Sequence, residues 1–159
     1  MSGGDLRYNM YKVSRFSQDQ ARFIVACLVM ALDYVHQNCL IHKDVKPENL
    51  VFDSKGYVKL TDFGIAKEYR TDNMADQQGT PAYMAPEVLN GQNHGYESDF
   101  YAVGVILHEL MFNSLPYNSI DRATLKDMIL QRKIRIKADE VPQNWSGEAA
   151  DFVTRLLQR

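Results

Sequence analysis

Apolar residues recur at helical spacing from Ser17 to about residue 37. Ser17 and Gln20, three positions later, form a capping-box signature that marks the start of the helix. One apolar stripe comprises Phe23, Cys27, Ala31 and Tyr34, and a second lies beside it at Ile24, Leu28 and Val35. The pattern predicts a long, mostly buried helix over about residues 17–37.

Two short apolar runs follow, LVF at 50–52 and YVKL at 57–60, on either side of DSKG. They predict a short β-hairpin with Gly56 in the turn. The next segment, residues 64–87, is polar and aperiodic with several Gly and Pro residues, and it predicts a long loop. A loop of this length in a compact domain is usually functional or mobile.

Helical patterns return in the second half of the chain. Residues 99–112 are apolar on nearly all sides, which predicts a buried central helix. Residues 121–131 and about 147–158 predict two amphipathic helices. No internal repeat or low-complexity tract interrupts the order of helix, hairpin, loop and helices.

Composition narrows the class of protein. A chain of 159 residues is one domain or part of one, and a net charge of -2 gives no broad attraction to nucleic acid or anionic lipid. Cys27 and Cys39 lack metal-ligand spacing and are expected to be buried free thiols. We find no secretory signal, no myristoylation start, no membrane anchor and no apolar run long enough to span a bilayer. A cytoplasmic or nuclear protein is therefore expected.

The candidate chemistry lies in HKDVKPEN at 42–49 and in DFG at 62–64. Asp44 could act as a base or orient a hydroxyl group, and Lys46 could reach a phosphoryl group. Asn49 and Asp62 offer oxygen ligands for a hard cation such as Mg²⁺. Any one of these residues alone would be an ordinary turn or cap. Their joint occurrence around a predicted hairpin suits phosphoryl transfer, in which catalysis is mostly positioning and charge neutralisation.

HKDVKPEN, DFG, GTPAYMAPE at 79–87 and SDFYAVGV at 98–105 together resemble the protein-kinase signature set, in its order and spacing. The resemblance implies an α+β fold, namely the mainly helical C-terminal lobe of a protein kinase with a small β-hairpin and without the N-terminal β-rich lobe. Residues 1–159 would form a partial kinase domain, from just after the hinge to the penultimate helices.

By this resemblance Asp44 is the catalytic base and Lys46 contacts the γ-phosphate of ATP. Asp99 would anchor the loop, and His42 would stack with Phe63. The residues placed at ATP and Mg²⁺ are Asp5, Leu6, Glu48, Asn49, Val51 and Asp62, of which Asn49 and Asp62 would hold the metal and Leu6 and Val51 would lie against adenine.

Lys46 and Thr80 resemble serine/threonine kinases, which implies a protein substrate with a Ser or Thr acceptor. GGDL at 3–6 is similar to the AGC group, and GGDLRY is nearest to its YANK-type members. Glu48 and Glu109 fall where basophilic members of the group hold substrate arginines, so basic residues upstream of the acceptor are expected. The alternative is that both are surface or capping acids.

Two departures from the family pattern concern regulation. Lys43 replaces the usual arginine before the catalytic Asp, and Asp76 stands where the AGC pattern has a phosphorylated Thr. A carboxylate facing a lysine would be a permanent, weaker version of a phosphate–arginine clamp. We therefore hypothesise that phosphorylation at this position does not switch the loop. The alternative is that Asp76 is a solvated loop residue. Thr80 is expected to hydrogen-bond Asp44 and Lys46, and Glu87 to be exposed or paired with a basic neighbour.

The sequence contains no G-x-G-x-x-G loop and no V-A-I-K lysine, which cover and hold the phosphates in the family. A partial domain that is inactive alone is therefore expected. Two functions remain open: an ATP-dependent serine/threonine kinase, or a non-catalytic kinase-lobe fragment that acts as a binding or decoy module. A phosphotransferase acting on small molecules is disfavoured by the APE segment.

Overall fold

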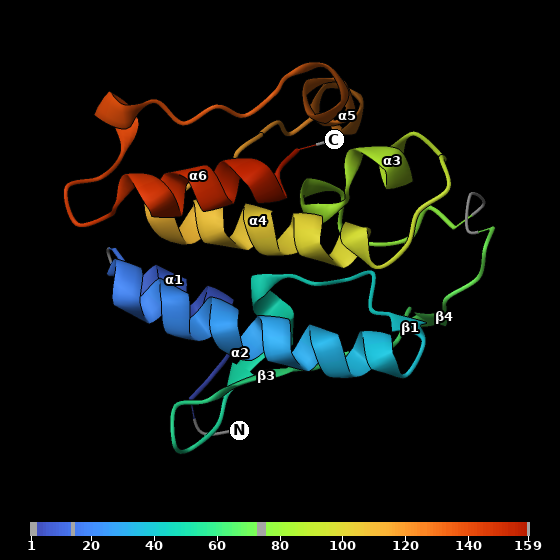
Figure 1. The fold of residues 1–159 in the computed structure, drawn as a ribbon, viewed down its shortest axis with the longest axis horizontal. Helices are drawn as coiled ribbons and strands as arrows, with labels where there is room; N and C mark the ends of the chain where they lie inside the picture. The colour runs from blue at the N-terminus through green and yellow to red at the C-terminus, as the bar shows by residue number, and fades with distance from the viewer. Residues whose placement is uncertain (1–2, 14, 73–75, 159) are drawn as a thin grey trace.

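The computed structural model describes residues 3–13, 15–72 and 76–158. Its helices stack in layers (Figure 1), with α4 (Glu97–Phe112) between α6 (Gly147–Leu156) on one side and α2 (Gln18–Gln37) on the other. A β-hairpin of β2 (Leu50–Phe52) and β3 (Val58–Leu60) lies against α2. The prediction of a mainly helical α+β fold with a small hairpin is confirmed.

Helix α2 begins as the capping box predicts. The Ser17 hydroxyl accepts from the Gln20 backbone N–H, and the Gln20 side chain accepts from the Ser17 N–H. The side chains that α2 buries are Ala21, Ile24, Val25, Leu28, Leu32 and Val35. Of the two predicted stripes, the second is thus the core face, whereas Phe23 and Tyr34 of the first are 46% and 70% exposed. Aromatic rings at helical spacing made the outer stripe look apolar, although it faces solvent.

Helix α4 is the buried central helix that its sequence predicts, with most of its side chains inaccessible. It ends at Asn113, which takes the left-handed conformation with φ 55° and whose N–H bonds the Glu109 carbonyl. A Cβ on Gly104 would lie 2.8 Å from the Leu156 Cβ. Glycine at this position therefore allows α4 and α6 to approach closely.

The hairpin pairs Leu50 with Leu60 and Phe52 with Val58 in antiparallel register. Gly56 takes φ 86° in its turn, as predicted. The sequence did not reveal the second sheet, in which β1 (Leu40–Ile41) pairs with β4 (Lys67–Glu68). Strands of two residues carry no periodicity, and their pairing joins segments that lie far apart in the chain.

The remaining elements surround this frame. The predicted amphipathic helices are α5 (Arg122–Gln131) and α6, whereas α1 (Leu6–Lys12) and α3 (Pro86–Leu89) were not predicted. Helix α1 begins at Asp5, whose carboxylate accepts from the Tyr8 N–H at 2.7 Å. Short 3₁₀ turns complete the chain: η1 (Pro47–Asn49), η2 (Pro81–Tyr83) and η3 (Ala138–Glu140). The predicted loop at 64–87 thus contains β4, η2 and the start of α3, and its residues 73–75 lie outside the described part.

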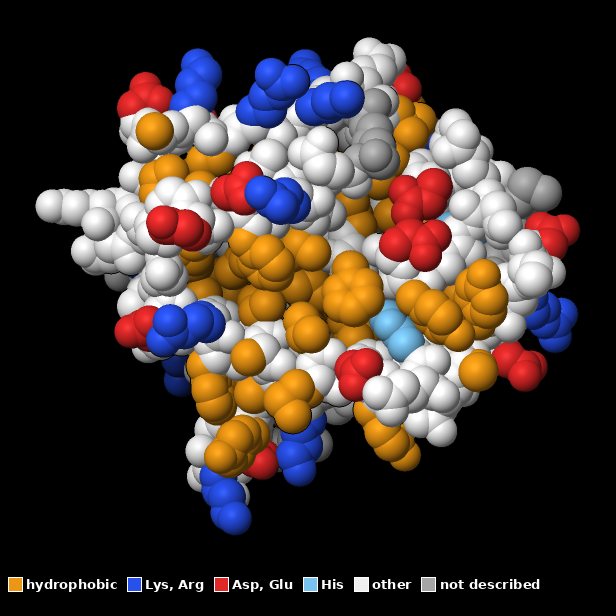
Figure 2. Space-filling model, viewed as in Figure 1, with side chains coloured by type: hydrophobic (Ala, Val, Ile, Leu, Met, Phe, Trp, Pro, Cys, Tyr) orange, Lys and Arg blue, Asp and Glu red, His pale blue; other side chains and the backbone are white. Residues whose placement is uncertain are grey.

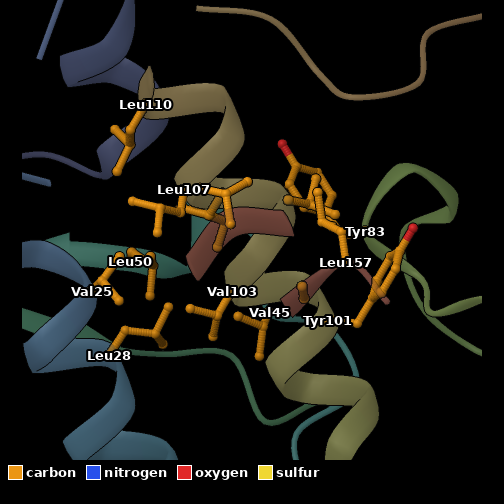
Figure 3. Close-up of a cluster of buried hydrophobic side chains, with 14 of the residues drawn as sticks. Val25, Leu28, Val45, Leu50, Tyr83, Tyr101, Val103, Leu107, Leu110 and Leu157 are labelled. Carbon is orange, nitrogen blue, oxygen red and sulfur yellow. The ribbon is translucent and has the colours of Figure 1, made fainter. Parts of the chain in front are cut away.

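The core gathers side chains from α2, α4 and the loop between them (Figure 3). Val25 and Leu28 face Val103 and Leu107, with Val45 and Leu50 beside them. A cleft bounded by α2, α4 and α6 has apolar lining residues that include Val29, Met30, Leu107, Trp145 and Phe152. Figure 2 shows apolar side chains gathered on this face of the molecule.

The cysteine prediction needs correction. Cys39 is exposed and Cys27 is half-buried, and both are free thiols. Cys39 takes φ 58° at the turn after α2, and its side chain is exposed although the apolar residues Leu40 and Ile41 follow it. Among the described residues, none of the helices combines the length and the apolar character that a membrane-spanning helix needs.

Candidate active site

The loop at residues 42–49, called the catalytic loop from here on, is fixed by one buried carboxylate. Asp99 on α4 is 1% exposed and accepts from the backbone N–H groups of His42, at 2.9 Å, and Lys43, at 2.8 Å. Its Oδ2 also lies 2.8 Å from Nε2 of His36. Lys43 takes φ 70°, a conformation that a non-glycine residue adopts only when its surroundings hold it. The predicted anchoring by Asp99 agrees with these contacts.

Three side chains hold the carboxylate of Asp44, namely those of Lys46, Thr80 and Asn49. Lys46 Nζ donates to its Oδ2 at 2.6 Å, and the Thr80 hydroxyl donates to its Oδ1 at 2.7 Å. Lys46 also donates to Thr80 Oγ1 at 3.0 Å, which closes the triangle, as expected for Thr80. Burial alone would raise the pKa of Asp44, but Lys46, Thr80 and Asn49 outweigh it and lower the pKa. Asp44 is therefore an oriented carboxylate that stays ionised at neutral pH.

Asn49 and Asp62 meet at one end of the hairpin. The Asn49 carbonyl accepts from the Thr61 N–H at 2.9 Å, and Asp62 follows Thr61 in the chain. The Asn49 amide donates to the Asp44 carbonyl at 2.8 Å, which leaves its side-chain oxygen available. Asp62 takes φ 63° and accepts from the Gly64 N–H at 3.2 Å.

This oxygen donor set fits a magnesium ion. The described residues contain no cluster of three or more His, Cys, Asp or Glu side chains arranged for a metal. Mg²⁺ is commonly held by one or two protein oxygens, with substrate phosphates and water as its other ligands. An amide and a carboxylate, Asn49 and Asp62, meet that requirement.

His42 and Phe63 make the predicted ring contact, with their centroids 4.9 Å apart and the rings edge to face. The imidazole Nε2 lies 3.1 Å from the Thr61 carbonyl, and Nδ1 lies 3.3 Å from the Asp44 N–H. A neutral ring that carries its proton on Nε2 satisfies both contacts. Burial lowers the pKa of His42, although Asp99 opposes the shift.

The expected adenine contacts are only partly accessible. Val51 is half-buried, and its backbone forms a bridge with Asp5 that joins the start of α1 to the hairpin. Leu6 is 0% exposed and belongs to the core. The described structure thus gives Leu6 a packing role rather than a surface open to a ring, because its side chain is covered on all sides.

The carboxylates of Glu48 and Glu109 are both paired with an arginine of the same chain. Arg7, which the sequence did not single out, bonds Glu48 Oε1 through Nε at 2.8 Å and Glu109 Oε1 through Nη1 at 2.5 Å. Of the alternative that the two residues are surface or capping acids, the surface position is wrong for Glu109, whose side chain is 8% exposed. The one feature of the sequence that could have pointed to Arg7 is its place directly after GGDL. Its two partners lie 41 and 102 positions away, so the sequence could not show the contacts.

Asp76 is a buried member of an ion-pair cluster, which excludes the alternative of a solvated loop residue. Its carboxylate pairs with Lys43 and lies 3.2 Å from Nζ of Lys67, which the sequence did not predict. The side chains of Lys43 and Asp76 are 3% and 10% exposed. Burial alone would raise the pKa of Asp76, but the two lysines outweigh it and lower the pKa.

Glu87 is half-buried rather than exposed, which corrects one of the two expectations. Burial raises its pKa, and the nearby charge of Glu97 adds to the shift. The basic residue close enough to oppose the shift is His94. The carboxyl of Glu87 therefore has a weak basic neighbour instead of a lysine or arginine partner among the described residues.

A positioned carboxylate, an ammonium beside it and two oxygen ligands on a hairpin are the parts that phosphoryl transfer uses. The protein kinase domain family matches residues 1–159. RAC-beta serine/threonine-protein kinase A of Xenopus laevis is 38% identical over 160 residues, which cover 99% of this chain and 32% of that protein. The human RAC-beta serine/threonine-protein kinase is 36% identical over 160 residues, with the same two coverages. Protein kinase 2 of Dictyostelium discoideum is 36% identical over 160 residues, which cover 100% of this chain and 32% of that protein.

The chain belongs to the protein kinase domain family. It spans 32% of the length of these relatives. The names of the RAC-beta relatives agree with the serine/threonine type that Lys46 and Thr80 indicated. The YANK-type assignment and the bounds of a partial domain stay predictions.

Proposed function

We propose that this chain takes part in transferring the γ-phosphate of ATP to serine or threonine hydroxyls of a protein substrate. The observation that carries the proposal is the closed triangle of Asp44, Lys46 and Thr80 on a loop fixed by Asp99. A carboxylate that is ionised and held by donors on two sides is ready to orient a substrate hydroxyl. A catalyst of this kind works mainly by positioning and charge neutralisation.

Each residue of the catalytic loop has a distinct task in this proposal. Asp44 orients the acceptor hydroxyl and takes its proton at a carboxylate oxygen. Lys46 places its ammonium beside that oxygen and neutralises charge that develops on the transferred group. Thr80 fixes the rotamers of both side chains, because its hydroxyl donates to one and accepts from the other.

Asn49 and Asp62 would hold Mg²⁺, and Val51 and Asp5 would lie near the nucleotide. When bound, Mg-ATP supplies the phosphoryl group and the metal charge that stabilises its oxygens. The protein contributes two hard oxygen ligands from the same end of the hairpin, one before β2 and one after β3. Asn49 is 5% exposed and bonded to Asp44, so the metal ligand and the base are fixed to each other.

The loop at Asp76 is held without phosphorylation in this proposal. The ion pair of Asp76 with Lys43 replaces the phosphate–arginine clamp, and Lys67 adds a second cation. Lys43 adjoins Asp44, so the pair connects the long loop directly to the catalytic loop. We expect the position to be permanently engaged, because a carboxylate carries its charge without modification.

A non-catalytic binding or decoy module is the second candidate. The apolar cleft between α2, α4 and α6 favours it, because exposed apolar surface is typical of interaction sites. The cleft does not include the catalytic loop, so binding and catalysis are separable by experiment. A cytoplasmic or nuclear location stays a prediction.

The decisive experiment measures phosphoryl transfer from labelled Mg-ATP to a serine/threonine peptide library. It uses this chain alone and a version extended upstream, each with a matched Asp44→Asn variant. Transfer that Asp44→Asn abolishes would support the kinase, and transfer by the chain alone would refute the expectation that it is inactive by itself. Transfer that survives Asp44→Asn would refute the proposed role of Asp44. If both versions are inactive, the binding module is favoured.

A further inference from the structure

Arg7 is the centre of a network that connects three elements of the fold. Its guanidinium reaches Glu48 of η1, Glu109 of α4 and the Tyr83 hydroxyl of η2. The Tyr83 hydroxyl donates to Glu109 Oε2 at 2.7 Å, and Arg7 Nη2 lies 3.3 Å from that same oxygen. The three acceptors are thus arranged around one guanidinium.

The network runs from the surface into the interior. The side chain of Glu48 is 45% exposed, that of Arg7 is 21% exposed, and that of Glu109 is 8% exposed. Tyr83 is 6% exposed. A carboxylate as buried as Glu109 needs a partner, because an uncompensated buried charge is costly. Arg7 supplies that partner from within the chain.

The position of the network relates it to peptide binding. Glu48 lies in the catalytic loop, four residues after Asp44, and Tyr83 lies three residues after Thr80. Asp44 and Thr80 are hydrogen-bonded to each other. A peptide whose hydroxyl reaches Asp44 would therefore pass close to the outer face of this acidic site.

We propose that Arg7 is a specificity-determining residue. Its guanidinium fills the acidic site that Glu48 and Glu109 form beside the acceptor position, and it thereby excludes a basic substrate side chain from that site. The proposal rests on the proposed kinase function and gives it a substrate class, namely peptides that need no arginine at the position facing that site. It replaces the sequence-based expectation that Glu48 and Glu109 select basic residues upstream of the acceptor.

The charge balance supports this assignment. Arg7 brings one positive charge to two carboxylates, and both oxygens of Glu109 have a donor. A substrate arginine could reach only the exposed part of Glu48, where solvent and salt weaken the attraction. Displacing Arg7 would require its bonds to both acids to be broken before the substrate gained any.

The test compares peptides that differ by one arginine. A serine peptide in which a single arginine moves through the positions on either side of the serine is measured against the all-alanine peptide, by fluorescence anisotropy. The proteins are the unmodified chain, Arg7→Gln, Arg7→Lys and the control Arg22→Gln. Arg22 pairs with Asp19 on the exposed surface of α2, so Arg22→Gln makes the same charge change at a remote site.

We expect the unmodified chain and Arg22→Gln to bind all of these peptides within about threefold of each other, because the acids are already occupied. Arg7→Gln should gain about tenfold in affinity for one arginine peptide, since two acids become free. Arg7→Lys should gain less, because lysine keeps the charge but cannot bridge both acids. Folding of each variant is checked by thermal unfolding, and Arg7→Lys decides the matter if Arg7→Gln does not fold.

An unmodified chain that already prefers one arginine peptide about tenfold would overturn the proposal, whatever the variants do. A folded Arg7→Gln or Arg7→Lys without any gain would overturn it as well. These readouts measure binding, so they are independent of phosphoryl transfer. Failure of the kinase proposal would appear instead in the Asp44→Asn assay.

Discussion

Removing the charge of Asp76 is expected to destabilise the chain far more than removing the charge of Lys43. In Asp76→Asn the Lys43 ammonium, whose side chain is 3% exposed, loses the one acidic partner that lies within ion-pair distance among the described residues. Breaking a buried pair in this way costs about 3–5 kcal/mol. We expect a value near the lower limit, because the lysine stem can turn partly toward solvent.

Lys43→Met has a different consequence. Asp76 then keeps Lys67, whose Nζ lies 3.2 Å away and whose side chain is 53% exposed. The methionine fills the volume of the lysine stem without a charge. We expect a loss of about 1 kcal/mol. In the double variant no buried charge remains unpaired, so its loss should fall about 2 kcal/mol below the sum of the two single losses.

Urea unfolding at neutral pH measures the free energy of unfolding of all four proteins. Asp19→Asn, which breaks the exposed pair with Arg22, is the control and should change stability by less than about 0.5 kcal/mol. Additive single losses, or a loss below about 1 kcal/mol for Asp76→Asn, would refute the buried ion pair.

The pH dependence of Asp76 gives an independent check. Its pKa is lower in the folded chain than its ordinary value. The stability it contributes is therefore complete above about pH 4 and is lost as the pH falls through the folded pKa. Asp76→Asn should flatten this acid-side loss, and an unchanged acid-side slope would contradict the assignment.

Three other substitutions test residues that belong to the catalytic loop or contact it. Burial lowers the pKa of His42, so the free energy of unfolding should fall as the pH drops below about 6.5. In urea unfolding, His42→Gln should reduce this dependence on pH, and an equal dependence in both proteins would refute the shift. Asp99→Asn removes one acceptor from the buried N–H groups of His42 and Lys43, and should lower the free energy of unfolding by about 2 kcal/mol. A loss under about 0.5 kcal/mol would count against the role of Asp99 as the anchor of the loop. Gly79→Ala places a Cβ 2.7 Å from the Lys43 carbonyl at φ 134° and should cost more than about 1 kcal/mol, whereas the control Gly147→Ala, with open space around it, should be neutral or stabilising.

The accuracy of the sequence-based predictions depended on the range of the interaction. Helix α2, helix α4 and the hairpin were predicted because a capping box, a wholly apolar run and a glycine turn are local signals. The contact of Thr80 with Asp44 joins positions 36 residues apart, and it was predicted only through the family resemblance. Spacing and composition alone could not have placed the two side chains together.

The sequence by itself determined the residue types of the site and the order of the elements that carry them. Only the tertiary structure decided which stripe of α2 faces the core, because burial depends on where α4 and the hairpin lie and not on the helix alone. Only the tertiary structure brought Lys67 to Asp76, and Arg7 to Glu48 and Glu109. A charge in a sequence has no partner until the fold brings one within a few ångströms, and here the fold pairs both Glu48 and Glu109 with a guanidinium of the same chain.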